Sequence, residues 1–151
     1  FMVYEAIAVQ NDEDALHLLG SKPEDVFSRV IISSDGSSKH TVPILKNGKR
    51  TPTSNVSLIA YEPNQASWQV STNLDGYLFV SDAYYPGWKA YVDGVSVAVF
   101  RADLAFRSVF VPQGEHVVDF RYEPMSFRLG LSMAAGSLIM VLATLLWSFR
   151  E

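Results

Sequence analysis

Cysteine is absent from the 151 residues of the chain. Without thiols the chain can form neither a disulfide bond nor a thiolate zinc site, and its composition fits either side of a membrane. Basic side chains are also scarce, with 12 Lys and Arg against 16 Asp and Glu and a net charge of −4. Because neutralising phosphates requires a concentrated basic surface, the sequence excludes a general nucleic-acid-binding protein, and we expect no nucleic-acid partner.

Recognisable catalytic motifs are missing as well. The three histidines, His17, His40 and His116, lie in separate segments without the short spacings of metal ligands. The chain has no glycine-rich phosphate-binding loop and no G-x-S-x-G nucleophile motif. We therefore predict no catalytic residue, no metal site and no cofactor, and the lack of any acid, base or nucleophile cluster argues against an independent enzyme.

One long apolar run is present near the end of the chain. Leu129–Phe149 contains 21 residues without a charge, and at about 1.5 Å per residue such a helix crosses a hydrocarbon core of roughly 30 Å. Arg128 and Arg150 flank the run, and Trp147 lies near one boundary, as expected for interfacial anchors. We predict a transmembrane helix rather than the buried helix of a soluble protein. A single arginine at each flank does not decide its orientation.

Small residues recur four positions apart within this run, as Gly130 with Ala134 and Ser132 with Gly136. Such spacing lets a second helix approach closely, which predicts contact with other membrane helices. Composition is an equally good explanation, because Gly and Ala are common in membrane helices.

Before the apolar run, between Val56 and Tyr122, apolar and polar residues alternate, and turn residues recur about every ten positions. This pattern is typical of an antiparallel sandwich or barrel. We predict an all-β fold: an antiparallel β-sandwich of about seven to nine strands, with a short N-terminal α/β element and one C-terminal transmembrane helix. The predicted segments are an N-terminal strand–helix–strand element packed on the sandwich (1–32), a polar loop (33–55), the sandwich (56–124), and the transmembrane helix with its tail (125–151).

Two local patterns refine this prediction. The N-terminal element should contain a helix over Asp12–Leu19, and the polar loop could hold a hairpin at Asn47-Gly48. The Asp93-Gly94 pair predicts a two-residue hairpin turn that places Trp88 opposite Val99 in one apolar stripe. We therefore expect Trp88 to be buried between sheets, and the neighbouring Tyr91 to point to the opposite, mixed face.

Aromatic residues near the Pro86-Gly87 corner suggest a binding role. Sugars are held by aromatic rings that stack on their C–H faces together with planar hydrogen-bonding groups. The candidate glycan-binding residues, expected on one outer rim, are Tyr84, Tyr85, Tyr91, Arg101 and Arg107. The alternative is that the tyrosines only cover the edge of the sandwich. Exposed rings would favour glycan binding, and complete burial would favour a structural role.

Three quoted stretches resemble a known family. SDAYYPGWKAYVDG (Ser81–Gly94), FRSVFVPQGEHVVDFRYEP (Phe106–Pro124) and the following SFRLGL are similar to the C-terminal end of the bacterial YfhO-like membrane proteins. The likeness covers most of the chain and is weakest across residues 33–55. It implies a large polytopic protein similar to GT-C-type glycosyltransferases that use lipid-linked sugars, acting on cell-envelope polymers such as teichoic acids.

The resemblance also implies which parts of that protein this chain lacks. The catalytic acid is expected on an extracytoplasmic loop near the N-terminal helices, to which no part of this chain corresponds, so no catalytic residue is carried over. The implied location is the cell membrane, with the β domain on the extracytoplasmic side. Implied partners are the remaining membrane helices of the parent protein and an envelope glycan or a polyprenyl-linked sugar.

Two functions follow as hypotheses. The first is an accessory ectodomain plus the last membrane helix of a polytopic glycosyltransferase-like protein, which holds an acceptor glycan or shapes the entrance to the catalytic cavity. The alternative is a non-catalytic structural or protein-interaction module that is anchored in the membrane and binds no sugar.

Overall fold

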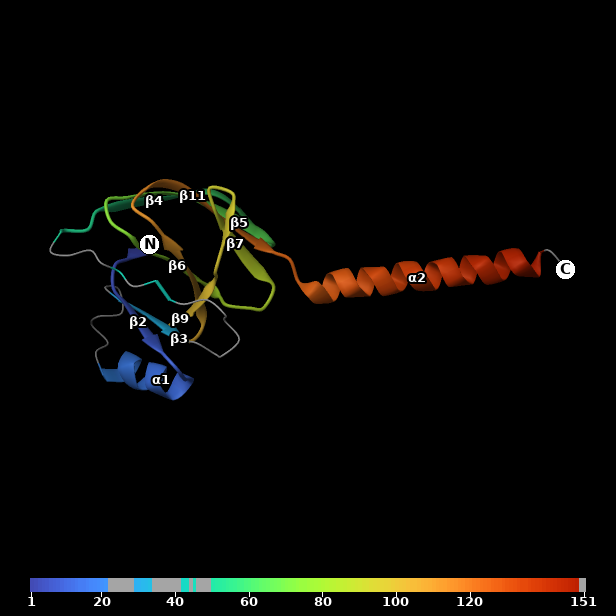
Figure 1. The fold of residues 1–151 in the computed structure, drawn as a ribbon, viewed down its shortest axis with the longest axis horizontal. Helices are drawn as coiled ribbons and strands as arrows, with labels where there is room; N and C mark the ends of the chain where they lie inside the picture. The colour runs from blue at the N-terminus through green and yellow to red at the C-terminus, as the bar shows by residue number, and fades with distance from the viewer. Residues whose placement is uncertain (22–28, 34–41, 44, 46–49, 150–151) are drawn as a thin grey trace.

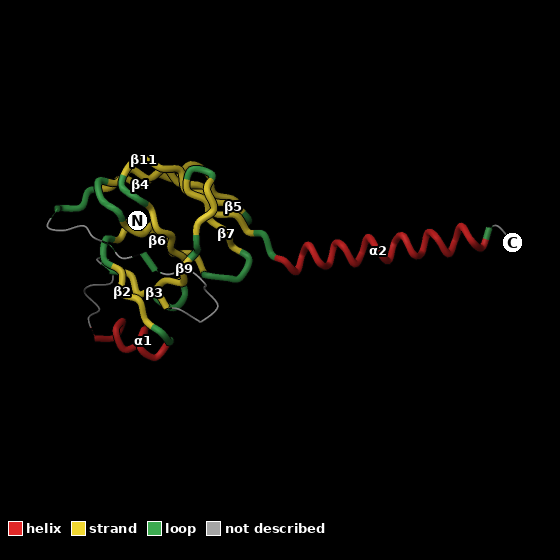
Figure 2. The backbone as a smooth tube through the Cα atoms, viewed as in Figure 1, coloured by secondary structure: helices red, strands yellow, loops and turns green. Residues whose placement is uncertain are grey.

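The computed structural model of the chain describes residues 1–21, 29–33, 42–43, 45 and 50–149. Within this part, two β-sheets lie face to face, a short helix covers one end of the first sheet, and a long helix extends away from both (Figure 1). The tube view shows the same separation of strands and helices (Figure 2). The predicted sandwich with a short α/β element and one C-terminal helix is confirmed.

The first sheet combines the N-terminal strands with strands from the middle of the chain. Its order is β1 (Met2–Val3), β6 (Gly76–Ala83), β10 (Phe106–Val111), β9 (Phe100–Ala102), β3 (Val30–Ser33) and β2 (Ala6–Val9). All neighbours are antiparallel except β2 and β3, which are parallel and have α1 (Asp12–Ser21) between them in the sequence. The side chain of Asn11 accepts a hydrogen bond from the N–H of Asp14 and so caps the first turn of α1.

The second sheet is antiparallel throughout. Its order is β4 (Ser54–Glu62), β5 (Gln65–Thr72), β11 (Gly114–Tyr122), β7 (Trp88–Val92) and β8 (Val95–Val97). The edge strand β4 is mostly exposed, and a bulge at Ile59 interrupts its pairing with β5. A bulge of this kind makes an edge a poorer template for pairing with another chain.

The core lies between the two sheets and continues onto the outer face of the first one. Side chains that alternate along β5, β6, β10 and β11, such as Val70, Leu78, Val109 and Phe120, fill the space between the sheets. The opposite face of the first sheet has its own buried cluster, against which Val42 and Leu45 pack. These two residues belong to the segment predicted as a polar loop, whereas the predicted hairpin at Asn47-Gly48 lies outside the described residues.

The hairpin at Asp93-Gly94 forms in the predicted register, with Val92 opposite Val95. The predicted pairing of Trp88 with Val99 requires the strand after the turn to continue at least to Val99, but the run Val95–Phe100 is divided between the sheets. It forms β8 in the second sheet, leaves that sheet after three residues, and enters the first sheet at Phe100 as β9. The crossing closes this side of the sandwich.

This division changes the environment of Trp88. With β8 ending before Val99, the strand partner of Trp88 is Tyr122 on β11. Trp88 packs against the inter-sheet core but is only partly buried, and Val95, from the predicted apolar stripe, is 68% exposed. Trp88 therefore packs against the space between the sheets, as predicted, but it is partly rather than fully buried.

The C-terminal helix α2 runs over Met125–Ser148 and starts immediately after Pro124. Residues Met125–Trp147 form the candidate membrane span, which is long and apolar enough to cross a bilayer. No part of that span is buried against the sandwich. A helix with this composition hides its apolar surface from water only in lipid or against other helices.

Candidate functional site

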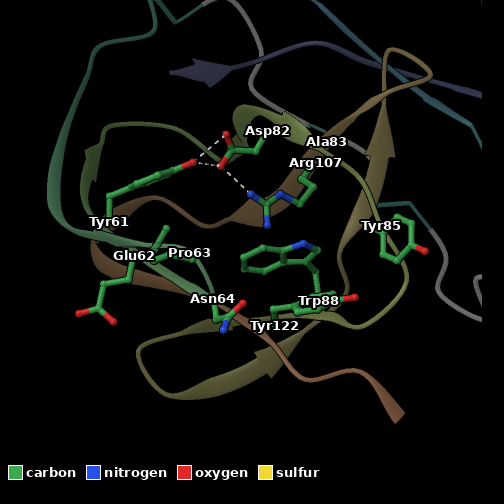
Figure 3. Close-up of a pocket in the computed structure, with 11 residues that line it drawn as sticks. Tyr61, Glu62, Pro63, Asn64, Asp82, Ala83, Tyr85, Trp88, Arg107 and Tyr122 are labelled. Atoms are coloured by element: carbon green, nitrogen blue, oxygen red, sulfur yellow. Dashed lines mark hydrogen bonds and ion pairs between the residues drawn. The ribbon is translucent and has the colours of Figure 1, made fainter. Parts of the chain in front are cut away.

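A pocket opens at the end of the sandwich from which α2 departs. Its volume is about 460 Å³, and its lining comes from the β4–β5 turn, the end of β6, the following corner, and single residues of β7, β10 and β11 (Figure 3). The lining residues are Tyr61, Glu62, Pro63, Asn64, Ala66, Asp82, Ala83, Tyr85, Trp88, Arg107 and Tyr122. We call this the root pocket, because it lies at the root of the helix.

An ion pair forms the polar wall of the root pocket. The Nη2 atom of Arg107 donates a hydrogen bond of 2.6 Å to Oδ2 of Asp82. The hydroxyl group of Tyr61 donates to the same carboxylate, at 3.2 Å from Oδ1 and 3.3 Å from Oδ2. Figure 3 shows Tyr61 directed at Asp82 and Arg107 lying over the Trp88 ring. The carboxylate thus links two elements that are far apart in the sequence.

A bulge brings the two charges together. In the pairing of β6 with β10, Phe106 lies opposite Ala83 but Arg107 lies opposite Val80, so Ser81 and Asp82 have no direct partner. Such a bulge bends the strand and redirects its side chains. Here it turns Asp82 toward the guanidinium group of Arg107.

Arg107 is almost completely buried, with 2% of its surface exposed. Its guanidinium carbon lies 3.8 Å from the ring centroid of Trp88 and 5.3 Å from that of Phe120, which is cation–π geometry. Burial lowers the pKa of Arg107, and the adjacent Asp82 opposes this effect. Its Nε and Nη1 atoms have no hydrogen-bond partner among the described residues.

Exposed aromatic rings surround the mouth of the pocket. Tyr61 is 60% exposed and Tyr85 is 62% exposed. The ring of Tyr122 lies 5.3 Å from Trp88 and 6.4 Å from Tyr85, centroid to centroid. A continuous aromatic surface therefore extends from the buried arginine to solvent.

The root pocket is tied to the start of α2 by two backbone hydrogen bonds. The N–H of Tyr122 donates to the carbonyl of Asn64 at 2.8 Å, and the N–H of Glu123 donates to the carbonyl of Gly87 at 2.7 Å. Gly87 has a φ of +110°, and a Cβ atom at this position would lie 3.1 Å from Cα of Pro124. Both loops that form the mouth are thereby held within a few residues of the first turn of the helix.

The family model for the bacterial membrane protein YfhO matches residues 45–134. The chain belongs to the YfhO family. The matched region includes every strand that contributes to the root pocket and the first ten residues of α2. No curated protein and no solved structure matches the chain. The predicted resemblance is confirmed, and the candidate membrane helix agrees with a family of membrane proteins.

Two of the five candidate glycan-binding residues of this YfhO-family chain line the root pocket, namely Tyr85 and Arg107. Tyr84 is a neighbour that does not line it, and the N–H of Tyr84 bonds to the carbonyl of Ala105. Arg101 lies directly opposite Arg107 on the neighbouring strand β9, does not line the pocket, and is paired with Asp12 at the start of α1.

Tyr91, the remaining candidate, is on the outer face of the second sheet, as its alternation with the buried Ala90 and Val92 requires. There the guanidinium carbon of Arg121 lies 5.1 Å from the Tyr91 ring centroid. The five candidates therefore do not share one rim in the structure.

Sequence reasoning did not name three of the residues that shape the pocket, Tyr61, Trp88 and Tyr122, as site residues. Trp88 and Tyr122 lie in motifs that carry the family resemblance, and Tyr61 is the next-to-last residue of β4. Alternation alone could not single them out, because an aromatic residue at a strand end can pack in a core or line a pocket with the same spacing.

Among the described residues, no group of three or more potential ligands could hold a metal ion. Nδ1 of His116 lies 2.6 Å from Oδ2 of Asp93 at the hairpin turn, far along β11 from the pocket. His17 is exposed on α1, and His40 is outside the described residues. The root pocket itself presents aromatic rings and hydrogen-bonding groups.

Proposed function

We propose that the chain is the extracytoplasmic accessory domain and last membrane helix of a polytopic, glycosyltransferase-like membrane protein that acts on cell-envelope glycopolymers. The root pocket carries this proposal, since an aromatic cleft with buried polar groups opens where the chain enters its membrane helix. Family membership supports the membrane location and a larger parent protein. In this role the domain holds a glycan segment close to the membrane surface, and catalytic residues come from other parts of the parent protein.

The chemistry of the pocket suits a glycan. Exposed rings such as Tyr61 and Tyr85 offer apolar faces to sugar C–H groups. Asp82, Arg107 and Asn64 supply planar groups that accept and donate hydrogen bonds. A pocket that combines mostly apolar walls with a few polar groups is the usual form of a small-molecule binding site.

A structural or protein-interaction module is the second candidate function. It is favoured by the internal contacts of two expected glycan-binding residues, Arg101 with Asp12 and Tyr91 with Arg121. In that case the parent protein would need the domain for assembly of its membrane helices and would use no pocket residue in transfer.

The deciding experiment measures glycosylation of envelope polymers in cells that produce the full-length parent protein. Tyr61→Ala and Tyr85→Ala should each lower sugar incorporation several-fold at an unchanged level of the protein in the membrane. Tyr91→Ala, on the outer face of the second sheet, is the matched control and should leave incorporation unchanged. Pocket variants that behave like Tyr91→Ala would support the structural module instead.

The side of the membrane is tested separately by labelling. Since the chain contains no cysteine, Ser96→Cys on β8 introduces a single thiol into the sandwich, and Arg150→Cys introduces one beyond the opposite end of α2. In a parent protein stripped of its other cysteines, an impermeant maleimide added to intact cells should label the first variant only. Labelling of the second variant alone would place the sandwich in the cytoplasm.

A further inference from the structure

The charges of the root pocket bear on which sugars it can bind. Two carboxylates, Glu62 and Asp82, and one guanidinium, Arg107, line it. The guanidinium is already paired with Asp82 at 2.6 Å, so its positive charge is locally neutralised. The Asp82–Arg107 pair is neutral overall, so an anionic ligand would gain little from Arg107 and would be repelled by the remaining negative charge of Glu62.

A ligand cation fits no better. The most favourable position for a cation is over the face of an indole ring, and the guanidinium of Arg107 occupies one face of Trp88 at 3.8 Å. An ammonium group therefore cannot take that position over the ring. The other face of the ring is next to Tyr122, at a tilt of 47°.

The polar atoms suit neutral hydroxyl groups instead. The Nε and Nη1 atoms of Arg107 have no acceptor among the described residues, but both are fully buried and out of reach of a ligand. The exposed side-chain amide of Asn64, which also lines the pocket, can donate instead. The hydroxyl of Tyr61 gives its hydrogen to Asp82, so its oxygen remains an acceptor for an incoming donor. A sugar hydroxyl both donates and accepts, and it can therefore satisfy both kinds of group without bringing a charge.

From these observations we propose that the root pocket binds an uncharged, polyhydroxylated sugar ring and rejects phosphorylated or acidic sugars. This inference rests on the proposed function and specifies the class of ligand for the same site. The ring stacks on the exposed aromatic surface, with hydroxyl groups directed at Tyr61 and Asn64. A volume of about 460 Å³ is toward the small end of ligand sites, which suits one or two sugar rings rather than a long polymer segment.

Binding should be weak, with a dissociation constant on the order of 1 mM, because a half-open cleft with exposed rings excludes little water. Weak binding is compatible with a role in holding one segment of a polymer, since the linked catalytic part of the parent protein would raise the effective concentration.

The test uses the full 151-residue chain in detergent micelles, with NMR signals of the Trp88 indole N–H and the Arg107 Nε–H as readouts. Methyl glycosides of glucose, galactose and N-acetylglucosamine are titrated beside glucose 6-phosphate and glucuronic acid. At least one neutral glycoside should produce saturable shifts, and the two anionic sugars should bind at least tenfold more weakly. Equal or tighter binding of an anionic sugar, or no saturable binding by any neutral glycoside, overturns the proposal.

Two exposed positions make the test independent of folding defects. Glu62→Gln should bring the affinity for glucose 6-phosphate closer to that for methyl glucoside. Tyr61→Phe should weaken the binding of neutral glycosides several-fold. Tyr91→Phe is the matched control and should change neither. If Glu62→Gln and Tyr61→Phe both match the control, the charge argument fails. A different result would separate the two proposals. If neutral glycosides bind the chain but the parent proteins with Tyr61→Ala or Tyr85→Ala transfer sugar normally, the proposed function is refuted. The proposal that the pocket binds uncharged sugars would then still hold.

Discussion

Removing the carboxylate of Asp82 should strongly destabilise the sandwich. Asp82→Ala leaves Arg107, which is 2% exposed, as an unpaired buried charge. At the 2.6 Å separation of Nη2 and Oδ2, an effective dielectric constant of about 20 gives an attraction of roughly 6 kcal/mol. Because the Asp82 side chain is 30% exposed, water offsets part of this energy. We expect a loss of about 3 kcal/mol, the lower end of the range for broken buried pairs.

The double variant separates the loss of an interaction from the cost of an orphaned charge. Arg107→Met keeps an unbranched side chain of similar reach but carries no charge. In the Asp82→Ala/Arg107→Met chain no buried guanidinium remains, so the free energy of unfolding should recover to within about 1 kcal/mol of the unchanged protein. The two substitutions should therefore be far from additive.

Urea denaturation in detergent micelles measures these differences. Trp68 and Trp88 report on the sandwich, and a Trp147→Phe background removes the signal of α2. Ser81→Ala, an exposed neighbour on β6, is the control and should change stability by less than about 0.5 kcal/mol. A cost for Asp82→Ala no greater than that control, or strict additivity in the double variant, would refute the reasoning.

Three further outcomes are expected. A chain ending at Pro124 should stay folded and soluble without detergent, whereas the complete chain should need lipid or detergent; monodisperse complete chain in plain buffer would contradict this. Gly87→Ala should destabilise by about 1–3 kcal/mol in urea denaturation, more than Gly94→Ala, which has a positive φ but no neighbour within 4 Å. The hydrogen bond with His116 lowers the pKa of Asp93, so its stabilisation should be present above about pH 4 and lost below it; melting of Asp93→Asn should lack that acid step.

Much of the sandwich could be predicted because turns and alternation agree along most strands. The hairpin turn at Asp93-Gly94, which follows β7 (Trp88–Val92), was predicted with the correct register. Apolar side chains at every second position leave few alternatives for a strand with one buried face. The uncharged run Leu129–Phe149 likewise predicted a long apolar helix, because such a helix hides its surface from water only in lipid or against other helices.

Sheet crossing could not be predicted from Val95–Phe100. Valine recurs at every second position from Val95 to Val99, although β8 ends at Val97 and the backbone then passes to the other sheet. The sequence pattern therefore does not show where the strand ends. The burial of Arg107 could not be predicted from the sequence for a related reason. Both faces of β10 are covered, and the bulge that supplies its counter-ion depends on pairing with a strand 25 positions away from Arg107 in sequence.

The two backbone hydrogen bonds to Asn64 and Gly87 hold the chain on the sandwich as far as Glu123, so only Pro124 separates this held segment from α2. A helix of 24 residues is about 36 Å long, which exceeds a typical hydrocarbon core and favours a tilt. In a bilayer, a connection this short would pass a change of that tilt on to the sandwich. The thickness of the bilayer would then influence the height and inclination of the root pocket above the lipid.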